Sequence, residues 1–379
     1  MKKEDYKRLN DYLNDAFIYL SKYDGFFIQN MHTIFRLNNM LYEKLKGIDL
    51  KHNFHKNNLT FEDVFELARN EIEKINSNYL KKFDKLIDSG RLEFFLYEQN
   101  MIIKGNTNHE EISEIENNEE ETRNDSVCSY NNGDYFIDLA RTYNYNDVLM
   151  LIHEFIHSTN SSKNMGEYRY ILTEFFSIYF EMLSQKDLLE NGINTSELDI
   201  FDRIKNTGKI SKKINKYYIV FMSYNLLGNI KEDSYEDLEK YNIVSSTKKE
   251  FECACVRLLK YFDYQKIQYN NESKEFNLYD YRKCISILFS SGYRYLLGTL
   301  FSCYLLENEN KDKIVWLNDH INDEEIKNMN FIDVLKIIGI DLTDENIDAK
   351  LVESAQNYYK NLSKYSVKEE KEKSLTYNV

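Results

Sequence analysis

The sequence predicts a mostly helical fold with a small β-sheet. Residues 60–87 place apolar side chains at every third or fourth position, the pattern of a helix with one buried face. Residues 146–160 and 167–190 are apolar nearly all round, which is typical of helices buried on every side. Two short segments, Met101–Ile103 and Asp134–Arg141, have the composition of strands.

Composition limits the classes of protein that the chain can belong to. Its 379 residues allow two or three domains, and its formal charge of -14 argues against a nucleic-acid partner. No apolar run reaches the length that a membrane span requires, so we expect no membrane partner. The 5 cysteines include no CxxC pair and no apolar leader opens the chain, which indicates reduced thiols and a cytoplasmic location.

Changes in composition divide the chain into four expected parts. Residues 1–105 should be a helical region that packs on the core. Residues 106–125 hold eight Asp or Glu against one Arg, which predicts a mobile acidic loop. Residues 126–365 should form the main domain, and the charged tail 366–379 should be frayed.

The expected elements follow one another as short strands and long helices. A capping box of Thr60 and Asp63 begins one helix over Thr60–Ile87. The strand Asp134–Arg141 comes shortly before the segment 146–160. We expect it either to offer a free edge to an extended peptide or to be an internal strand of the sheet.

The segment 146–160 contains the order His153-Glu154-x-x-His157, which is a zinc-hydrolase signature. Residues four apart in a helix lie one turn apart on one side, so both imidazoles can bind a single ion. Glu154 lies within about 60° of His157 around the helix axis, where its carboxylate can reach a water molecule at that ion.

The next helix supplies carboxylates in one narrow stripe. Glu174, Ser177 and Glu181 fall at i, i+3 and i+7 among large apolar residues, so we expect the two carboxylates to be buried and therefore paired. Glu174 would complete a His, His, Glu site for one Zn²⁺ per chain with one position left open, as catalytic zinc requires. Glu181 either orients a ligand histidine or pairs with a base elsewhere.

The C-terminal third is again helical. Helices are expected over Leu198–Lys205, Lys216–Leu227 and Lys248–Gln265, and two more within Phe331–Tyr365, separated at Gly339–Thr343. Within the apolar stretch 280–306, small residues such as Gly298 allow another backbone to approach closely. Tyr293 and Tyr295 either turn their hydroxyls into a cleft or pack in the core.

Together these segments resemble the thimet oligopeptidase and oligoendopeptidase F family of zinc peptidases. Asp134–Ser158 is similar to that family's strand, Asn-Asp-Val turn and zinc helix, and Glu174–Glu181 to its second-helix motif. Ser291–Leu306 resembles its tyrosine and glycine segment, and Phe331–Leu362 its closing helices. Thr60–Phe95 is a fainter match to the segments that precede its catalytic core.

The resemblance implies a helical, zincin-type peptidase whose deep substrate channel admits short peptides. His153, His157 and Glu174 would bind zinc, Glu154 would be the catalytic base, and Tyr293 or Tyr295 would steady the oxyanion. The chain departs from the family at Ile156, where a Gly is usual. It also has no counterpart of a substrate-contacting His before the tyrosine segment.

The expected activity is therefore zinc-dependent hydrolysis of internal bonds in short peptides. Two alternatives stay open. One is an exopeptidase that captures a peptide terminus, and the other is a peptidase-like protein that binds zinc or peptides with little or no turnover. The sequence leaves the oligomeric state open.

Overall fold

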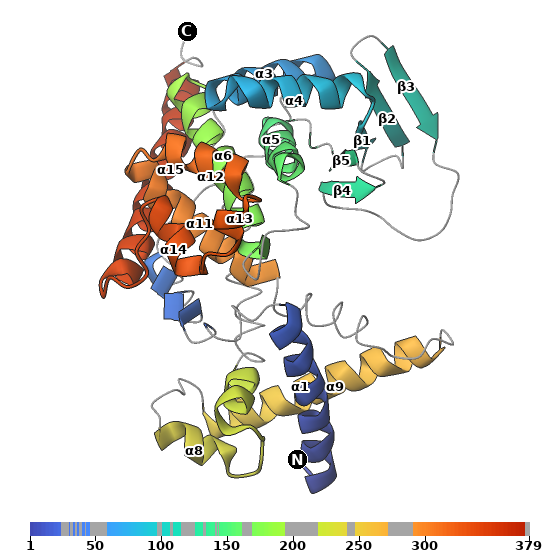
Figure 1. Ribbon diagram of the computed structural model, residues 1–379, viewed down its shortest axis with the longest axis vertical. Coiled ribbons are helices and arrows are strands. Elements are labelled where there is room, and N and C mark those ends of the chain that lie inside the picture. Colours follow the sequence, from blue (N-terminus) through green and yellow to red (C-terminus); the bar gives the residue numbers. More distant parts are fainter. Residues whose placement is uncertain are drawn as a thin grey trace. The chain divides into compact units, whose positions relative to one another are not determined.

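The computed structural model describes a mostly helical protein with one β-sheet (Figure 1). Described are residues 1–23, 59–96, 101–106, 109–114, 126–131, 134–140, 142, 144–160, 169–193, 219–240, 247–271 and 291–375, with isolated residues between 30 and 45. Among these residues, no helix combines the length and the apolar composition that crossing a membrane requires. The predicted helix over Leu198–Lys205 lies outside the described residues.

The chain forms two compact units. Unit 1 consists of Met1–Tyr42 and Asp202–Leu296, and unit 2 of Glu43–Phe201 and Leu297–Val379. The expected boundary near residue 105 is not one of these boundaries, because the strands before and after it pair in one sheet and the helix before it packs on the helix of the His-Glu-x-x-His motif.

Unit 1 is built on the contact between two long helices, α1 (Lys3–Tyr23) and α9 (Lys248–Asn271), which cross in Figure 1. The Tyr12 hydroxyl donates to Asp263 Oδ1 at 3.0 Å, and the Tyr12 ring lies 5.2 Å from that of Phe262. A helix over residues 219–227 and α8 (Ser234–Lys240) also belong to this unit. The predicted helices over Lys216–Leu227 and Lys248–Gln265 are confirmed wherever their residues are described.

The predicted single helix over Thr60–Ile87 is wrong, because two helices occupy the segment. These are α3 (Phe61–Ile75), which begins at the predicted Thr60–Asp63 capping box, and α4 (Ser77–Asp88). Asn76 separates them with an extended backbone, and its side-chain oxygen accepts from Asn78 N at 2.7 Å. A short polar side chain that caps a new helix competes with continuation of the old one, although the apolar stripe runs through both.

The sheet has five strands in the order β3-β2-β1-β5-β4. The strands are β1 (Leu92–Leu96), β2 (Met101–Asn106), β3 (His109–Glu114), β4 (Val127–Asn131) and β5 (Asp134–Ala140). All neighbours are antiparallel except β1 and β5, which are parallel. The strand predicted over Asp134–Arg141 is thus internal, and the strand at the edge beside it is β4.

The acidic stretch 106–125 is not entirely a loop, because β3 occupies part of it and the rest lies outside the described residues. The register of β2 and β3 pairs Lys104 with Glu111 and Ile103 with Ile112. Net acidity along one segment therefore did not exclude a strand.

Two adjacent helices form the centre of unit 2. They are α5 (Asn146–Thr159) and α6 (Arg169–Glu190), which pack against each other. Figure 1 shows α5 between the pair α3 and α4 and the strands β4 and β5, all of which contact it. All the residues of α5 from Asp147 to Ile156 are buried. This agrees with the expectation from an apolar circumference.

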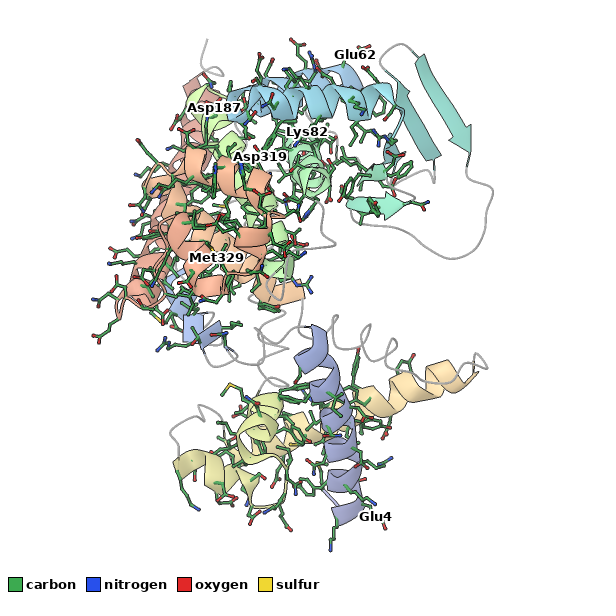
Figure 2. The ribbon with its side chains drawn as sticks, in the orientation of Figure 1. Glu4, Glu62, Lys82, Asp187, Asp319 and Met329 are labelled. Carbon is green, nitrogen blue, oxygen red and sulfur yellow. The ribbon has the colours of Figure 1, made fainter. Side chains whose placement is uncertain are left out.

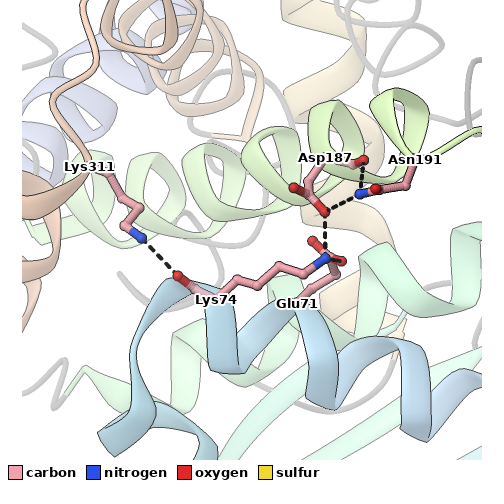
Figure 3. Close-up of polar contacts among 5 residues, drawn as sticks. All are labelled: Glu71, Lys74, Asp187, Asn191 and Lys311. Carbon is pink, nitrogen blue, oxygen red and sulfur yellow. Dashed lines mark hydrogen bonds and ion pairs between the residues drawn. The ribbon is translucent and has the colours of Figure 1, made fainter.

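The C-terminal end of α6 is fixed to α3 by charged side chains (Figure 3). Lys74 Nζ lies 2.6 Å from Glu71 Oε1 and 2.5 Å from Asp187 Oδ2, and Asn191 also donates to Asp187 Oδ2 at 2.9 Å. Lys311 Nζ donates to the Lys74 carbonyl at 2.8 Å. Glu71 is 3% exposed, so its charge depends on Lys74 for compensation.

Five helices lie between residue 291 and residue 375. They are α11 (Ser291–Glu307), α12 (Lys311–His320), α13 (Glu324–Lys327), α14 (Phe331–Ile337) and α15 (Ile347–Leu375). The last two confirm the predicted helices on either side of Gly339–Thr343. An ion pair joins Lys82 of α4 to Asp319 of α12 at 3.8 Å, and both residues are labelled in Figure 2.

Residues 366–375 of the tail continue α15, and the expectation that this end of the helix frays stays a prediction. This segment, VKEEKEKSL after Ser366, is rich in Glu and Lys, and both are strong helix formers that also favour helix when four residues apart. Residues 376–379 lie outside the described residues.

Candidate metal centre

The helix α5 presents the two histidines of the motif one turn apart. The ring centroids of His153 and His157 are 4.9 Å apart, and their Nε2 atoms are 3.2 Å apart. His153 is 3% exposed, whereas the His157 side chain keeps 20% of its surface accessible. Both imidazoles therefore direct a nitrogen to one point, and only His157 borders solvent.

Glu174 of α6 brings a carboxylate to the same point. Its Oε2 lies 3.7 Å from His153 Nε2 and 3.8 Å from His157 Nε2. The ligand atoms of these three residues lie within 4.8 Å of one another, so the group could hold a metal ion. Glu174 Oε2 is buried and makes no hydrogen bond among the described residues, an arrangement that is costly unless a cation compensates the charge.

The spacing of these atoms can be compared with the size of a bound ion. A four-coordinate zinc ion with bonds of about 2.0–2.1 Å holds its ligand atoms roughly 3.3 Å apart. The three observed separations are 3.2, 3.7 and 3.8 Å. The three atoms therefore fit a tetrahedral ion after small side-chain adjustments. Among the described residues, this group supplies three of the four ligands of such an ion.

Glu181 contacts His153 on the ring nitrogen that is not directed at Glu174 and His157. Its Oε2 lies 2.7 Å from His153 Nδ1, and Glu181 is 1% exposed. A neutral imidazole that donates from Nδ1 carries a lone pair on Nε2, and this is the nitrogen that faces Glu174 and His157. Of the two roles left open for Glu181, the structure shows the contact that orienting a histidine requires.

Glu154 is on the same helix and is 7% exposed. Among the described residues its carboxylate makes no hydrogen bond or ion pair. Cys128 of β4 is its neighbour: burial raises the pKa of that thiol, and the carboxylates of Glu154 and Asp138 raise it further. No sequence motif marks Cys128, because only the pairing of β4 beside β5 brings this strand to α5.

Asp147 fixes the start of α5. Its Oδ1 accepts from Thr142 N and from Thr142 Oγ1, both at 2.7 Å, while Asn144 Oδ1 accepts from Asn146 N at 2.8 Å. Asp147 is fully buried. These bonds connect the end of β5 to the first turn of α5, so they set the direction in which the helix carries its two histidines.

Tyr293 and Tyr295 lie in the first turns of α11. Tyr293 is buried and Tyr295 is half-buried. Both belong to unit 1, which ends at Leu296 within this helix, whereas His153, His157, Glu174 and Glu181 belong to unit 2. A role for either tyrosine hydroxyl at the metal centre therefore stays a prediction.

Comparison of the chain with models of protein families, with curated proteins and with solved structures finds no match. What the centre can do is therefore judged from its own donor set. Two imidazole nitrogens and one carboxylate oxygen are a donor set that could hold a metal ion, and a further buried carboxylate lies on the same helix as the imidazoles.

Proposed function

We propose that this chain is a zinc-dependent peptidase of the helical zincin type that hydrolyses internal bonds of short peptides. The observation that carries the proposal is the convergence of His153 Nε2, His157 Nε2 and Glu174 Oε2 within 4.8 Å, with Glu154 one residue from a histidine of this group. Structural zinc sites are normally closed by four protein ligands and rich in Cys, whereas this group offers three ligands and no thiol.

The donor set favours zinc among the common divalent ions. Imidazole and carboxylate together suit zinc, while calcium and magnesium take oxygen ligands. When bound, zinc supplies Lewis acidity and lowers the pKa of a water molecule to about 7. His153, His157 and Glu174 would hold the ion, and Glu181 would keep the His153 ring in the tautomer and orientation that binding needs.

Glu154 is the proposed general base. Its carboxylate accepts a proton from the attacking water and returns it to the nitrogen of the leaving amine, which balances the hydrolysis of one amide bond. The carboxylate is suited to this task because it is buried yet has no partner among the described residues that would have to be displaced. A hydroxyl of Tyr293 or Tyr295 is the proposed donor to the oxyanion.

The strand β4 is the proposed support for the substrate backbone. It is the last strand of the sheet on the side of α5, so within the described chain its outer edge has no strand partner. An extended peptide could add to this edge by main-chain hydrogen bonds. β4 contacts α5, the helix that carries Glu154, so a peptide held at this edge would lie near the helix of the proposed base.

The test is cleavage of internally quenched peptides by the zinc-loaded protein and by its Glu154→Gln variant. We expect the variant to keep about one zinc per chain and to lose roughly 10²–10⁴-fold in kcat, the usual contribution of a general base. Glu325→Gln, at an exposed glutamate of α13, is the matched control and should leave the rate unchanged. An unimpaired rate in Glu154→Gln would remove that residue from the mechanism.

The same assay separates the alternatives. Peptides with blocked termini are cleaved by an endopeptidase and spared by an exopeptidase. Binding of zinc with no cleavage of any peptide in a library, by the wild-type protein, would show a peptidase-like binding protein.

A further inference from the structure

A second cavity lies elsewhere in unit 2. Its volume is about 460 Å³, and residues of α6, α11 and α15 line it, with Glu309 after α11. One part of its wall is apolar and includes Leu189, Leu306 and Leu362. The volume is within the range of sites for small organic molecules, which are typically apolar with a few placed polar groups.

The polar part of the wall carries charges of both signs. Lys186, Glu190 and Glu309 make no ion pair or hydrogen bond among the described residues, and all three are exposed. The other two charged groups of the wall have partners: Glu307 accepts from Ser354 at 2.5 Å, and Lys364 donates to Asn361 at 2.8 Å. A ligand can therefore meet one ammonium and two carboxylates that no described side chain neutralises.

Glu309 is held at this wall by its backbone. Its φ is 50°, the left-handed region that favours glycine, and it is the only such non-glycine residue in the described chain. A non-glycine residue in that region is held at a conformational cost. The short link between α11 and α12 thus directs an acidic side chain to the cavity where a glycine would be the easier choice.

We infer that this cavity is a second ligand site, for a small zwitterion with an apolar side chain, such as a free apolar amino acid or a dipeptide, and that it communicates with the metal centre through Tyr358. Lys186 would receive the carboxylate, and Glu190 and Glu309 the ammonium. An anion alone would be repelled by the two carboxylates, whereas a zwitterion matches both signs of charge. The choice of ligand rests on the proposed function, because cleavage of internal bonds releases short zwitterionic peptides, and a free amino acid carries the same two charged groups.

Tyr358 connects the cavity to the metal centre. It lines the cavity and its hydroxyl donates to Gln185 Oε1 at 2.7 Å. Gln185 is fully buried and lies one helical turn from Glu181, which contacts His153 Nδ1 at 2.7 Å. Burial, Cys303 and the Glu181 carboxylate together raise the pKa of Tyr358. An occupant that moves Tyr358 would disturb its hydrogen bond to Gln185, one helical turn from the carboxylate that contacts His153.

The binding test is calorimetric titration of the full, zinc-loaded chain with L-leucine, which has no peptide bond to be cleaved, and with leucyl-leucine on the Glu154→Gln variant. We expect one saturable site for at least one of these probes. Lys186→Met should weaken its binding by about tenfold or more, as loss of a charged hydrogen bond does. Lys313→Met, at an exposed lysine of α12, is the control and should bind as wild type.

Two results would overturn the site itself. One is the absence of saturable binding by both probes, and the other is equal affinity in Lys186→Met and wild type. N-acetyl-leucinamide, which carries neither charge, should not bind; binding as tight as that of leucine would show an apolar cavity without zwitterion recognition. Binding of leucine that depends on Lys186 would stand even if no peptide were cleaved, so the two proposals fail separately.

The coupling between the cavity and the metal centre is tested by a separate measurement. Coupling is reciprocal, so saturating leucine should change the zinc dissociation constant, measured against a competing chelator, by roughly fivefold or more. Tyr358→Phe keeps the ring and removes the hydroxyl, so it should bind leucine and lose this change. An unchanged zinc affinity in the wild-type protein would refute the connection through Tyr358.

Discussion

At the scale of single residues, the position of Glu181 explains why a second acidic residue accompanies the motif. Its carboxylate contacts the nitrogen of His153 that faces away from Glu174 and His157, at 2.7 Å. A buried glutamate with a histidine partner is satisfied, and the histidine is fixed in one orientation. The i, i+7 spacing from Glu174 placed both carboxylates on one face of α6, but the sequence could not decide which histidine either would meet.

This contact predicts a graded effect on zinc affinity. Glu181→Met removes both charge and acceptor and should weaken zinc binding by about 10–100-fold, the usual cost of losing such a partner. Glu181→Gln keeps an acceptor for His153 Nδ1–H and should lose less. Competition with a chelator measures both, with Glu325→Gln as the control. Equal zinc affinity in Glu181→Met and wild type would contradict the orienting role.

At the scale of elements, periodicity identified helices well and their ends less well. The stripe over residues 60–87 is continuous across α3 and α4, so only the capping by Asn76 reveals the break. Likewise, the composition of Asp134–Arg141 predicted a strand. Whether an edge of that strand is free depends on β1 and β4, and composition does not show that these two strands pair with it. Local signals determine the type of an element, and its neighbours determine its role.

The contact between α11 and α6 depends on Gly298. A Cβ atom there would lie 2.8 Å from Ile178 Cδ1 and 3.3 Å from the backbone Cα of Phe175, which follows Glu174. Although Ala favours helix over Gly, we expect Gly298→Ala to destabilise the protein, because overpacking costs about 1–3 kcal/mol. It should also weaken zinc binding by displacing Glu174.

The matched variant for that test is the double substitution Gly298→Ala with Ile178→Val, which removes Cδ1. It should recover part of the stability in denaturant unfolding, since the closer of the two contacts is relieved. A stabilised Gly298→Ala protein with wild-type zinc affinity would show that the helices are not in close contact at this point.

The ion pairs of Lys74 with Glu71 and Asp187 form a clamp between α3 and α6. Breaking this clamp should lower the free energy of unfolding by more than breaking a surface ion pair would. Lys74→Met leaves the buried Glu71 without its cation and should cost about 1–2 kcal/mol, less than a fully buried pair because half of the lysine is exposed to solvent. Lys82→Met breaks the 3.8 Å pair with Asp319 and should cost at most about 0.5 kcal/mol. Equal losses in denaturant unfolding would contradict the clamp.

The pH dependence of the clamp follows from its lysine. Burial works to lower the pKa of Lys74, but the hydrogen bonds to Asp187 and Glu71 outweigh it and raise the pKa above 10.5. A base whose pKa is raised in the folded state stabilises fully below its unfolded pKa and loses that contribution as pH rises through the folded pKa. The difference between wild type and Lys74→Met should therefore shrink above about pH 10.5.

At the scale of the whole molecule, the residues of the proposed centre come from one continuous stretch of sequence. Each of the two units, in contrast, is built from two separate segments of the chain. The motif and the stripe on α6 lie within residues 153–181, so helical geometry predicted which side chains share a face of each helix, and only the packing of α5 on α6 brings them together. The chain passes from one unit to the other after residues 42, 201 and 296, and the last of these boundaries falls inside the helix α11. No change of composition marks such a boundary, because a continuous helix has the same pattern on both sides.

The central claim is that two imidazoles and the Glu174 carboxylate hold one zinc ion in the intact chain. X-ray absorption of the purified, zinc-replete protein tests this most directly, combined with the zinc content per chain. We predict about one zinc with nitrogen and oxygen ligands at roughly 2.0–2.2 Å, and loss of that zinc in Glu174→Ala. Sulfur ligands at roughly 2.3 Å, or an undiminished zinc content in Glu174→Ala, would contradict the account.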